Sequence, residues 1–177
     1  WSSDVCSSDL LVTLIPAVTN AYAASGLTFE FVARPSRNVR MVWLSGYSWN
    51  NQFGFEYMDS WCFRWWWNSP DFRLPVWEAG GWKRHTASCT MRLNAAGTGA
   101  LVELWKDGAL GASDERSGKT AAYMATTTQN PWIIGGEYQR SGMSLQGEIC
   151  AVRIYGRVLT EAELRANSDL DRHRFGF

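Results

Sequence analysis

The sequence lacks a surplus of charge: its 177 residues carry 17 lysines and arginines against 17 aspartates and glutamates, and no basic run occurs. Proteins that bind nucleic acid or anionic membranes through electrostatics carry a net positive charge or a basic stripe. The chain also has no stretch of the ~18 apolar residues that a membrane-spanning helix needs. These absences argue against nucleic acid as a partner and against membrane insertion.

Cysteine and histidine are scarce. The four cysteines, Cys6, Cys62, Cys89 and Cys150, show no C-x-x-C spacing, and the two histidines do not form a cluster. The pattern therefore gives no zinc site of the usual kind. Cys89 and Cys150 lie in apolar strand patterns, which predicts small buried side chains. A disulfide between two of Cys62, Cys89 and Cys150 stays open, because spacing alone cannot decide it.

Tryptophan is abundant by contrast, with 11 residues, and glycine and short strand-like runs outnumber helical patterns. Such a composition favours an all-β sandwich or barrel, and a chain of this length suits one domain with a sizeable core. Flat aromatic rings stack well on the C–H faces of sugars, but most tryptophans of a β domain fill its core. The aromatic residues therefore have to be sorted strand by strand.

The first residues, Trp1–Leu10, fit no periodic pattern and resemble the translated remnant of a sequencing adapter. If 1–10 is such a remnant, it is a non-native stub, and we then expect 11–177 to be a single domain truncated at its N-terminus. Leu11–Ile15 is either a first β-strand or the tail of a secretory signal that ends in Ala21-Tyr22-Ala23. The missing basic segment and the short apolar run favour the strand, followed by a connection that contains proline and asparagine.

Aromatic residues alternate with other residues on both sides of Met58-Asp59-Ser60, a pattern typical of a β-hairpin. A two-residue loop would set aromatic residues opposite polar ones, whereas a three-residue loop pairs the aromatic residues with one another. We predict the second register, because a slip by one residue moves every side chain to the other face. It pairs Tyr57 with Trp61, Phe55 with Phe63 and Phe53 with Trp65, as a core wall. The opposite face then holds Glu56, Cys62, Arg64 and Trp66.

Further strands are predicted by apolar alternation between turn residues, at Gly26–Pro35, Val39–Leu44, Trp82–Leu93, Ala100–Lys106, Pro131–Gly135 and Gly147–Tyr155. Asp107-Gly108 predicts a tight turn with positive φ. One helix is expected near the C-terminus. Thr160 and Glu163 form a capping box, Leu159 can pack on Leu164, and the helix should end near Leu170.

The segment Gly147–Leu164, with Asn167 after it, is similar to the closing strand and helix of laminin G-like domains of the concanavalin A-like lectin/glucanase superfamily. Gly26–Pro35 resembles the first core strand of that family. The resemblance implies a two-sheet antiparallel jelly-roll β-sandwich with one short C-terminal helix. Two positions depart from the family: Val32 stands where tryptophan is frequent, and Gly156 where asparagine is usual. Both glycine and asparagine tolerate left-handed backbone, so we expect the turn before the helix to be kept.

Relatives in this superfamily that cleave β-glucans carry a Glu-x-Asp-x-x-Glu strand, and this motif is absent. A retaining glycosidase needs two carboxylates about 5–5.5 Å apart, but Glu56, Glu103 and Glu148 have no acidic partner at alternate positions of their strands. His85 and His173 show no nucleophile or aspartate in a catalytic pattern. We therefore predict that the domain is not an enzyme.

Calcium is the cofactor that the resemblance leaves open, because some jelly rolls hold one Ca²⁺ through six to eight loop oxygens. The acidic residues at expected loops and strand ends are Asp71, Glu78, Asp114, Glu115 and Glu137. No acidic loop motif gathers them, so the sequence names no calcium ligands.

The resemblance and the missing acid pair favour a binding module for glycans or cell-surface proteins, within a larger extracellular protein. Rings that stack on sugars and side chains that bond hydroxyl groups define the candidate site. Its residues are Trp66, Arg64, Glu56, Trp49, Asn50, Asn51, Tyr47 and Trp77. Two alternatives stay open: a structural or adhesive spacer without its own ligand, and a glycoside hydrolase with carboxylates in an unfamiliar arrangement.

Overall fold

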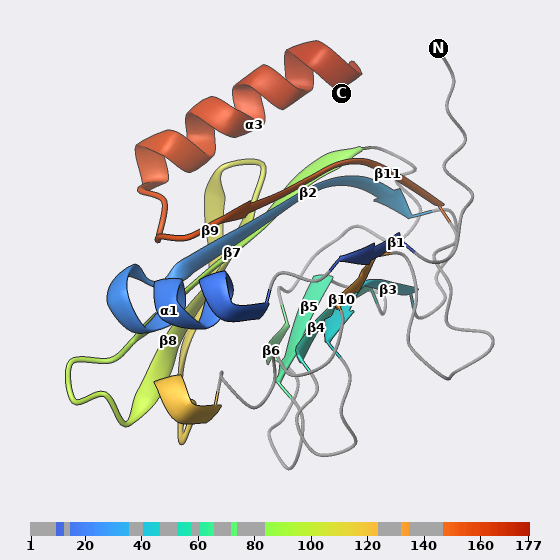
Figure 1. The fold of residues 1–177 in the computed structure, drawn as a ribbon. Helices are drawn as coiled ribbons and strands as arrows, with labels where there is room; N and C mark the ends of the chain where they lie inside the picture. The colour runs from blue at the N-terminus through green and yellow to red at the C-terminus, as the bar shows by residue number, and fades with distance from the viewer. Residues whose placement is uncertain are drawn as a thin grey trace.

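The structure is a computed structural model, and it describes residues 10–12, 15–35, 41–46, 53–57, 61–65, 72–73, 84–123, 132–134 and 147–177. Within these ranges the chain forms two antiparallel β-sheets with helices packed around them (Figure 1). The five-stranded sheet lies between the C-terminal helix on one side and the six-stranded sheet on the other (Figure 1). The two-sheet architecture predicted from the sequence is confirmed.

The five-stranded sheet ends, on one side, in a meander of three consecutive strands. Its strands, in spatial order, are β11 (Gly147–Tyr155), β2 (Leu27–Pro35), β7 (His85–Leu93), β8 (Gly99–Lys106) and β9 (Ala109–Ser117). The predicted tight turn joins β8 to β9, with φ of 50° at Asp107 and 77° at Gly108. Positive φ at both positions matches the twist of the two strands, which explains the Asp-Gly sequence there.

The six-stranded sheet is built from shorter strands. In spatial order they are β1 (Leu10–Val12), β10 (Trp132–Ile134), β3 (Met41–Gly46), β4 (Phe53–Tyr57), β5 (Trp61–Trp65) and β6 (Phe72–Arg73). The β4–β5 hairpin has the predicted register, with Tyr57 opposite Trp61, Phe55 opposite Phe63 and Phe53 opposite Trp65. The match of aromatic positions therefore decided the register correctly.

The described core lies on the inner face of the five-stranded sheet. Phe29 is fully buried, and so are Cys89 and Leu104, which follow it across β7 and β8 in register. Burial of one large apolar side chain stabilises the fold by about 1.5–3 kcal/mol. Cys89 and Cys150 are both free thiols, so no pair among the last three cysteines forms a disulfide.

The segment after β1 is a helix, which the sequence did not lead us to expect. We predicted a strand over Leu11–Ile15 and then an irregular connection, but β1 ends at Val12 and α1 spans Ile15–Ser25. Proline is tolerated in the first helical turn, and four alanines between 17 and 24 favour the helix. The Ala21-Tyr22-Ala23 sequence lies inside α1. Tyr22 is buried in the core and donates its hydroxyl to Lys119 O at 2.7 Å.

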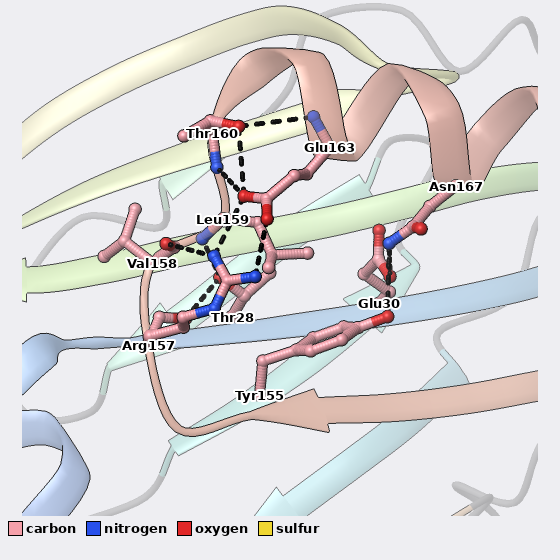
Figure 2. Close-up of polar contacts among 9 residues, drawn as sticks. All are labelled: Thr28, Glu30, Tyr155, Arg157, Val158, Leu159, Thr160, Glu163 and Asn167. Carbon is pink, nitrogen blue, oxygen red and sulfur yellow. Dashed lines mark hydrogen bonds and ion pairs between the residues drawn. The ribbon is translucent and has the colours of Figure 1, made fainter.

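The C-terminal helix α3 spans Glu161–Phe175 and begins with the predicted capping box (Figure 2). The Thr160 side chain accepts a hydrogen bond from Glu163 N, and the Glu163 side chain accepts one from Thr160 N. Leu159 and Leu164 are buried in one cluster with Trp105, so the predicted packing of Leu159 on Leu164 is confirmed. The helix continues five residues past the predicted end at Leu170, because a basic last turn precedes a left-handed Gly176.

The turn before α3 is held to the sheet, but not for the reason we gave. Gly156 has no positive φ, so the left-handed backbone expected there was wrong. A Cβ at Gly156 would lie 3.3 Å from Ala21 Cβ, so contact with α1 limits the size of this side chain. Thr28 fixes the turn instead: its hydroxyl donates to Arg157 O and accepts from Leu159 N, both at 2.9 Å (Figure 2).

Candidate functional site

Backbone register brings two predicted site positions together on the six-stranded sheet. Glu56 of β4 is opposite Cys62 of β5, which is opposite Arg73 of β6. Arg64 lies two residues further along β5, opposite Gly54. Positions in register share a face, and alternate positions along a strand share that same face. Glu56, Arg64 and Arg73 therefore belong to one face of the sheet, and we call these three positions the charged row.

The opposite face of the same strands carries only apolar positions and one glycine. Phe72, Phe63, Phe55 and Leu44 follow one another in register from β6 to β3, and Ile134 of β10 continues the line. A sheet with one apolar and one polar face packs the apolar face on the core. The charged row accordingly belongs to the outer face of the sandwich.

Arg73 is a position that the sequence analysis missed. It lies in β6, a strand of two residues, in a part of the chain for which the sequence analysis predicted no strand. The alternation of Phe72 and Arg73 was the available signal, but two residues are too few to distinguish a strand from a loop. Only the pairing of β6 with β5 identifies it.

The remaining predicted residues, Trp66, Trp49, Asn50, Asn51, Tyr47 and Trp77, lie outside the described residues. The backbone that flanks most of them is nevertheless informative. Gly46, the last residue before Tyr47, is opposite Phe53, which is opposite Trp65, the last residue before Trp66. The chain therefore leaves the sheet towards both segments from the same end, one row beyond Arg64.

Two of the glutamates weighed for acid–base chemistry make structural contacts. Glu148 binds two arginines, with Arg34 Nη2 at 2.5 Å from Oε1 and Arg84 Nη2 at 3.0 Å from Oε2. Thr90 donates its hydroxyl to Glu103 Oε2 at 2.9 Å. Each carboxylate thus stabilises the five-stranded sheet with a partner from a neighbouring strand.

His85 has an aspartate partner that its sequence neighbourhood did not reveal. Its Nδ1 is 2.7 Å from Asp107 Oδ2, and Asp107 Oδ1 accepts a hydrogen bond from Thr86 N at 3.0 Å. The backbone of Asp107 also donates to Thr86 O at 2.8 Å. Asp107 therefore ties the β8–β9 turn to the start of β7, which is a structural role for the histidine–aspartate pair.

Two of the five acidic residues considered for calcium are described. Asp114 pairs with Arg116 at 2.7 Å, and Glu115 accepts a hydrogen bond from Asn94 at 2.8 Å. The two are adjacent in β9 and so belong to opposite faces. In the described ranges, no three His, Cys, Asp or Glu residues are grouped to hold a metal ion. Asp71, Glu78 and Glu137 lie outside those ranges.

A second polar cluster lies beneath α3, on the outer face of the five-stranded sheet (Figure 2). Glu30 of β2 and Asp171 of α3 are fully buried. Asn167 of α3 donates to Glu30 Oε2 at 2.9 Å and to the Tyr155 hydroxyl at 3.1 Å. Burial raises the pKa of Tyr155 to about 12, helped by the neighbouring Glu30. Because α3 covers these groups, they offer no surface to a substrate.

No helix in the described part of the chain is long and apolar enough to cross a membrane.

Known structures resemble this fold at low sequence identity. The CBM40 module of the IT-sialidase of Ruminococcus gnavus, bound to α2,3-sialyllactose, has a TM-score of 0.67 and 16% identity, over 92% of this chain and 94% of that chain. A sialidase of Trypanosoma rangeli in complex with 2,3-difluorosialic acid has a TM-score of 0.59 and 17% identity, over 86% of this chain and 24% of that chain. A SAP-like pentraxin of Limulus polyphemus has a TM-score of 0.56 and 13% identity, over 81% of this chain and 69% of that chain.

No curated protein matches the sequence. A family model described as the concanavalin A-like lectin/glucanases superfamily matches residues 12–165, which is most of the chain. That match agrees with the two antiparallel sheets and with the sequence resemblance. The chain therefore belongs to the concanavalin A-like lectin/glucanase superfamily, in its laminin G-like branch.

Proposed function

We propose that this domain is a non-catalytic carbohydrate-binding module that takes its ligand on the outer face of the six-stranded sheet. The observation that carries the proposal is the charged row of Glu56, Arg64 and Arg73, on a face opposite an apolar one. Guanidinium and carboxylate groups supply the directional hydrogen bonds that fix a sugar, and aromatic rings supply the stacking surface. The strands that lead into Trp66 and into the 47–51 segment end next to Arg64, at Trp65 and Gly46, and for that reason we include these residues in the candidate site.

An acidic sugar is the ligand class that the charged row favours. Two arginines share the face, and a guanidinium binds a carboxylate through two parallel hydrogen bonds. The structurally similar module of Ruminococcus gnavus was determined with sialyllactose, which carries such a carboxylate. A neutral glycan would use the same face through stacking and through hydroxyl contacts to Glu56.

The absence of catalysis is part of the proposal. Its support is the missing Glu-x-Asp-x-x-Glu motif and the similarity to the carbohydrate-binding CBM40 module of the Ruminococcus gnavus sialidase. The described glutamates that were weighed as catalytic, Glu103 and Glu148, have structural partners. A hydrolase would need a pair of carboxylates exposed in a cleft.

We further propose that the domain works outside the cell or at its surface, attached to other domains. The similar segment of the Trypanosoma rangeli sialidase makes up 24% of that chain, so this fold does occur within a longer protein. Detection of the full-length gene product in the culture medium or on intact cells tests the location.

Calorimetric titration with a panel of acidic and neutral oligosaccharides tests the binding function. Sialyllactose and lactose make a matched pair, because they differ by one acidic sugar. We expect binding that weakens at least tenfold when Arg64→Ala or Trp66→Ala is introduced. The control is Arg92→Ala, at an exposed arginine of β7 in the other sheet. No binding to any member of the panel would remove the proposal and would leave the spacer role.

A further inference from the structure

Two buried carboxylates from different elements share one arginine beneath α3. Glu30 of β2 and Asp171 of α3 have no exposed surface. Arg153 of β11 donates from Nη1 to Asp171 Oδ2 at 2.7 Å and from Nη2 to Asp171 Oδ1. The same Nη1 lies 3.8 Å from Glu30 Oε2. With both carboxylates ionised, the cluster carries one net negative charge away from water.

Glu30 is the member whose charge is less well compensated. Arg153 makes both short contacts to Asp171, so Glu30 depends on neutral donors. Asn167 donates to its Oε2 at 2.9 Å (Figure 2). Ser88 donates to its Oε1 at 3.4 Å, and Tyr155 also hydrogen-bonds it. Neutral donors stabilise a buried carboxylate less than a close guanidinium does.

The groups that face Glu30 come from three neighbouring elements. β11 contributes the Arg153 guanidinium and the Tyr155 hydroxyl, and β7 contributes the neutral Ser88. α3 contributes the Asp171 carboxylate and the neutral Asn167. When α3 docks, it therefore removes Glu30 from water and brings a second negative charge beside it. Both changes disfavour an ionised Glu30.

We infer that Glu30 binds a proton when α3 docks, so that acidification stabilises the packing of α3 on the five-stranded sheet. Burial is the largest influence on the pKa of Glu30 and raises it; Tyr155, Asn167 and Arg153 oppose this effect, and Asp171 adds to it. A raised folded-state pKa gives a stabilisation that is complete below the ordinary value of 4.5. That stabilisation is lost as the pH rises through the folded-state value. α3 is thus held least firmly at neutral and alkaline pH.

The wild-type protein provides a direct test. Carbon-detected NMR of the glutamate carboxyl groups gives the pKa of Glu30 in the folded protein. The inference expects a value above 4.5 and an inflection at the same pH in the chemical shifts of α3 amides. A Glu30 pKa at or below the ordinary carboxyl value would overturn it. So would α3 amides that do not respond to the titration.

The variant Glu30→Gln tests the coupling, because glutamine has the shape of the protonated carboxyl without its charge. Hydrogen exchange of α3 amides, corrected for intrinsic rates, should be slower in the variant than in wild type at pH 7.5. The expected ratio is about tenfold for each unit by which the pKa is raised. The ratio should approach one near pH 4.5. Glu115→Gln, at an exposed carboxylate of β9, is the control and should give a ratio of one at both pH values.

A ratio for Glu30→Gln that is the same at both pH values would show a pH-independent packing change and would overturn the inference. If this variant does not fold, the titration of the wild-type protein decides alone.

Discussion

Glutamate and arginine residues hold positions on both outer faces of this sandwich, and one of these faces is covered by a helix. On the five-stranded sheet, Glu30 and Arg153 lie beneath α3, and the glutamate has no exposed surface. On the six-stranded sheet, Glu56, Arg64 and Arg73 hold neighbouring register positions on the face away from the core. In the described part of the chain α3 is the helix that closes the first face, and we assign glycan binding to the second.

The difference teaches that residue type does not identify a binding face. A charged residue that is covered by a helix has to find its partners within the protein, as Asp171 does with Arg153. Its removal therefore costs stability. A charged residue on an uncovered face remains hydrated, and its removal costs little stability but can abolish recognition. Stability and binding measurements on matched arginine variants separate the two cases.

The largest effect on stability is expected for Arg153→Ala. It leaves Glu30 and Asp171 buried without their shared cation, which should lower the free energy of unfolding by about 3 kcal/mol. Arg64→Ala should change that free energy by less than about 0.5 kcal/mol. Urea unfolding followed by tryptophan fluorescence measures both. Equal losses in the two variants would show that Arg64 is also a structural residue, and the distinction between the faces would be lost.

The parts of the fold that the sequence predicted depend on contacts between residues that are close along the chain. The β4–β5 register follows from aromatic alternation around a three-residue loop. The start of α3 follows from Thr160 and Glu163, which lie three residues apart. The Asp107-Gly108 turn follows from the backbone freedom of those two residues. In each case the interaction that determines the structure is local, so the sequence pattern is sufficient to predict that structure.

The parts that were missed depend on distant contacts. Helix α1 has a core anchor, Tyr22, whose hydrogen bond goes to Lys119, 97 residues away. The residues of α1 on either side of Tyr22 form no clear amphipathic stripe, so the hydropathy pattern of the sequence does not predict this helix. Arg73 joined the candidate site only through the pairing of β6 with β5. The polar cluster beneath α3 unites residues from four elements, and no spacing in the sequence predicts it.

A smaller effect, of opposite sign, is expected for Ser168→Ala. Ser168 is fully buried in the interface of α3, and its hydroxyl has no hydrogen-bond partner within the described residues. Removal of an unsatisfied buried hydroxyl, together with the higher helix propensity of alanine, should raise the free energy of unfolding by about 1.5 kcal/mol. The reverse change at an exposed position of the same helix, Ala166→Ser, measures the propensity part, about 0.5 kcal/mol. A loss of stability in Ser168→Ala would indicate that the hydroxyl does have a partner.

The smallest effect concerns Glu163, which contrasts with Glu30 on the same helix interface. Arg157 and then Thr160 hold the pKa of Glu163 down at about 2 (Figure 2). A lowered folded-state pKa gives a stabilisation that is present above the ordinary value of 4.5 and is lost as the pH falls through about 2. Glu163→Gln should therefore be less stable than wild type at neutral pH and equal to it near pH 2. For Glu30→Gln the difference has the opposite sign at neutral pH and disappears already near pH 4.5. Unfolding free energies of both variants, measured across this pH range, distinguish a carboxylate that is exposed to solvent from one that is covered by the helix. If both variants differed from wild type with the same sign at neutral pH, the assignment of one of the two residues would be contradicted.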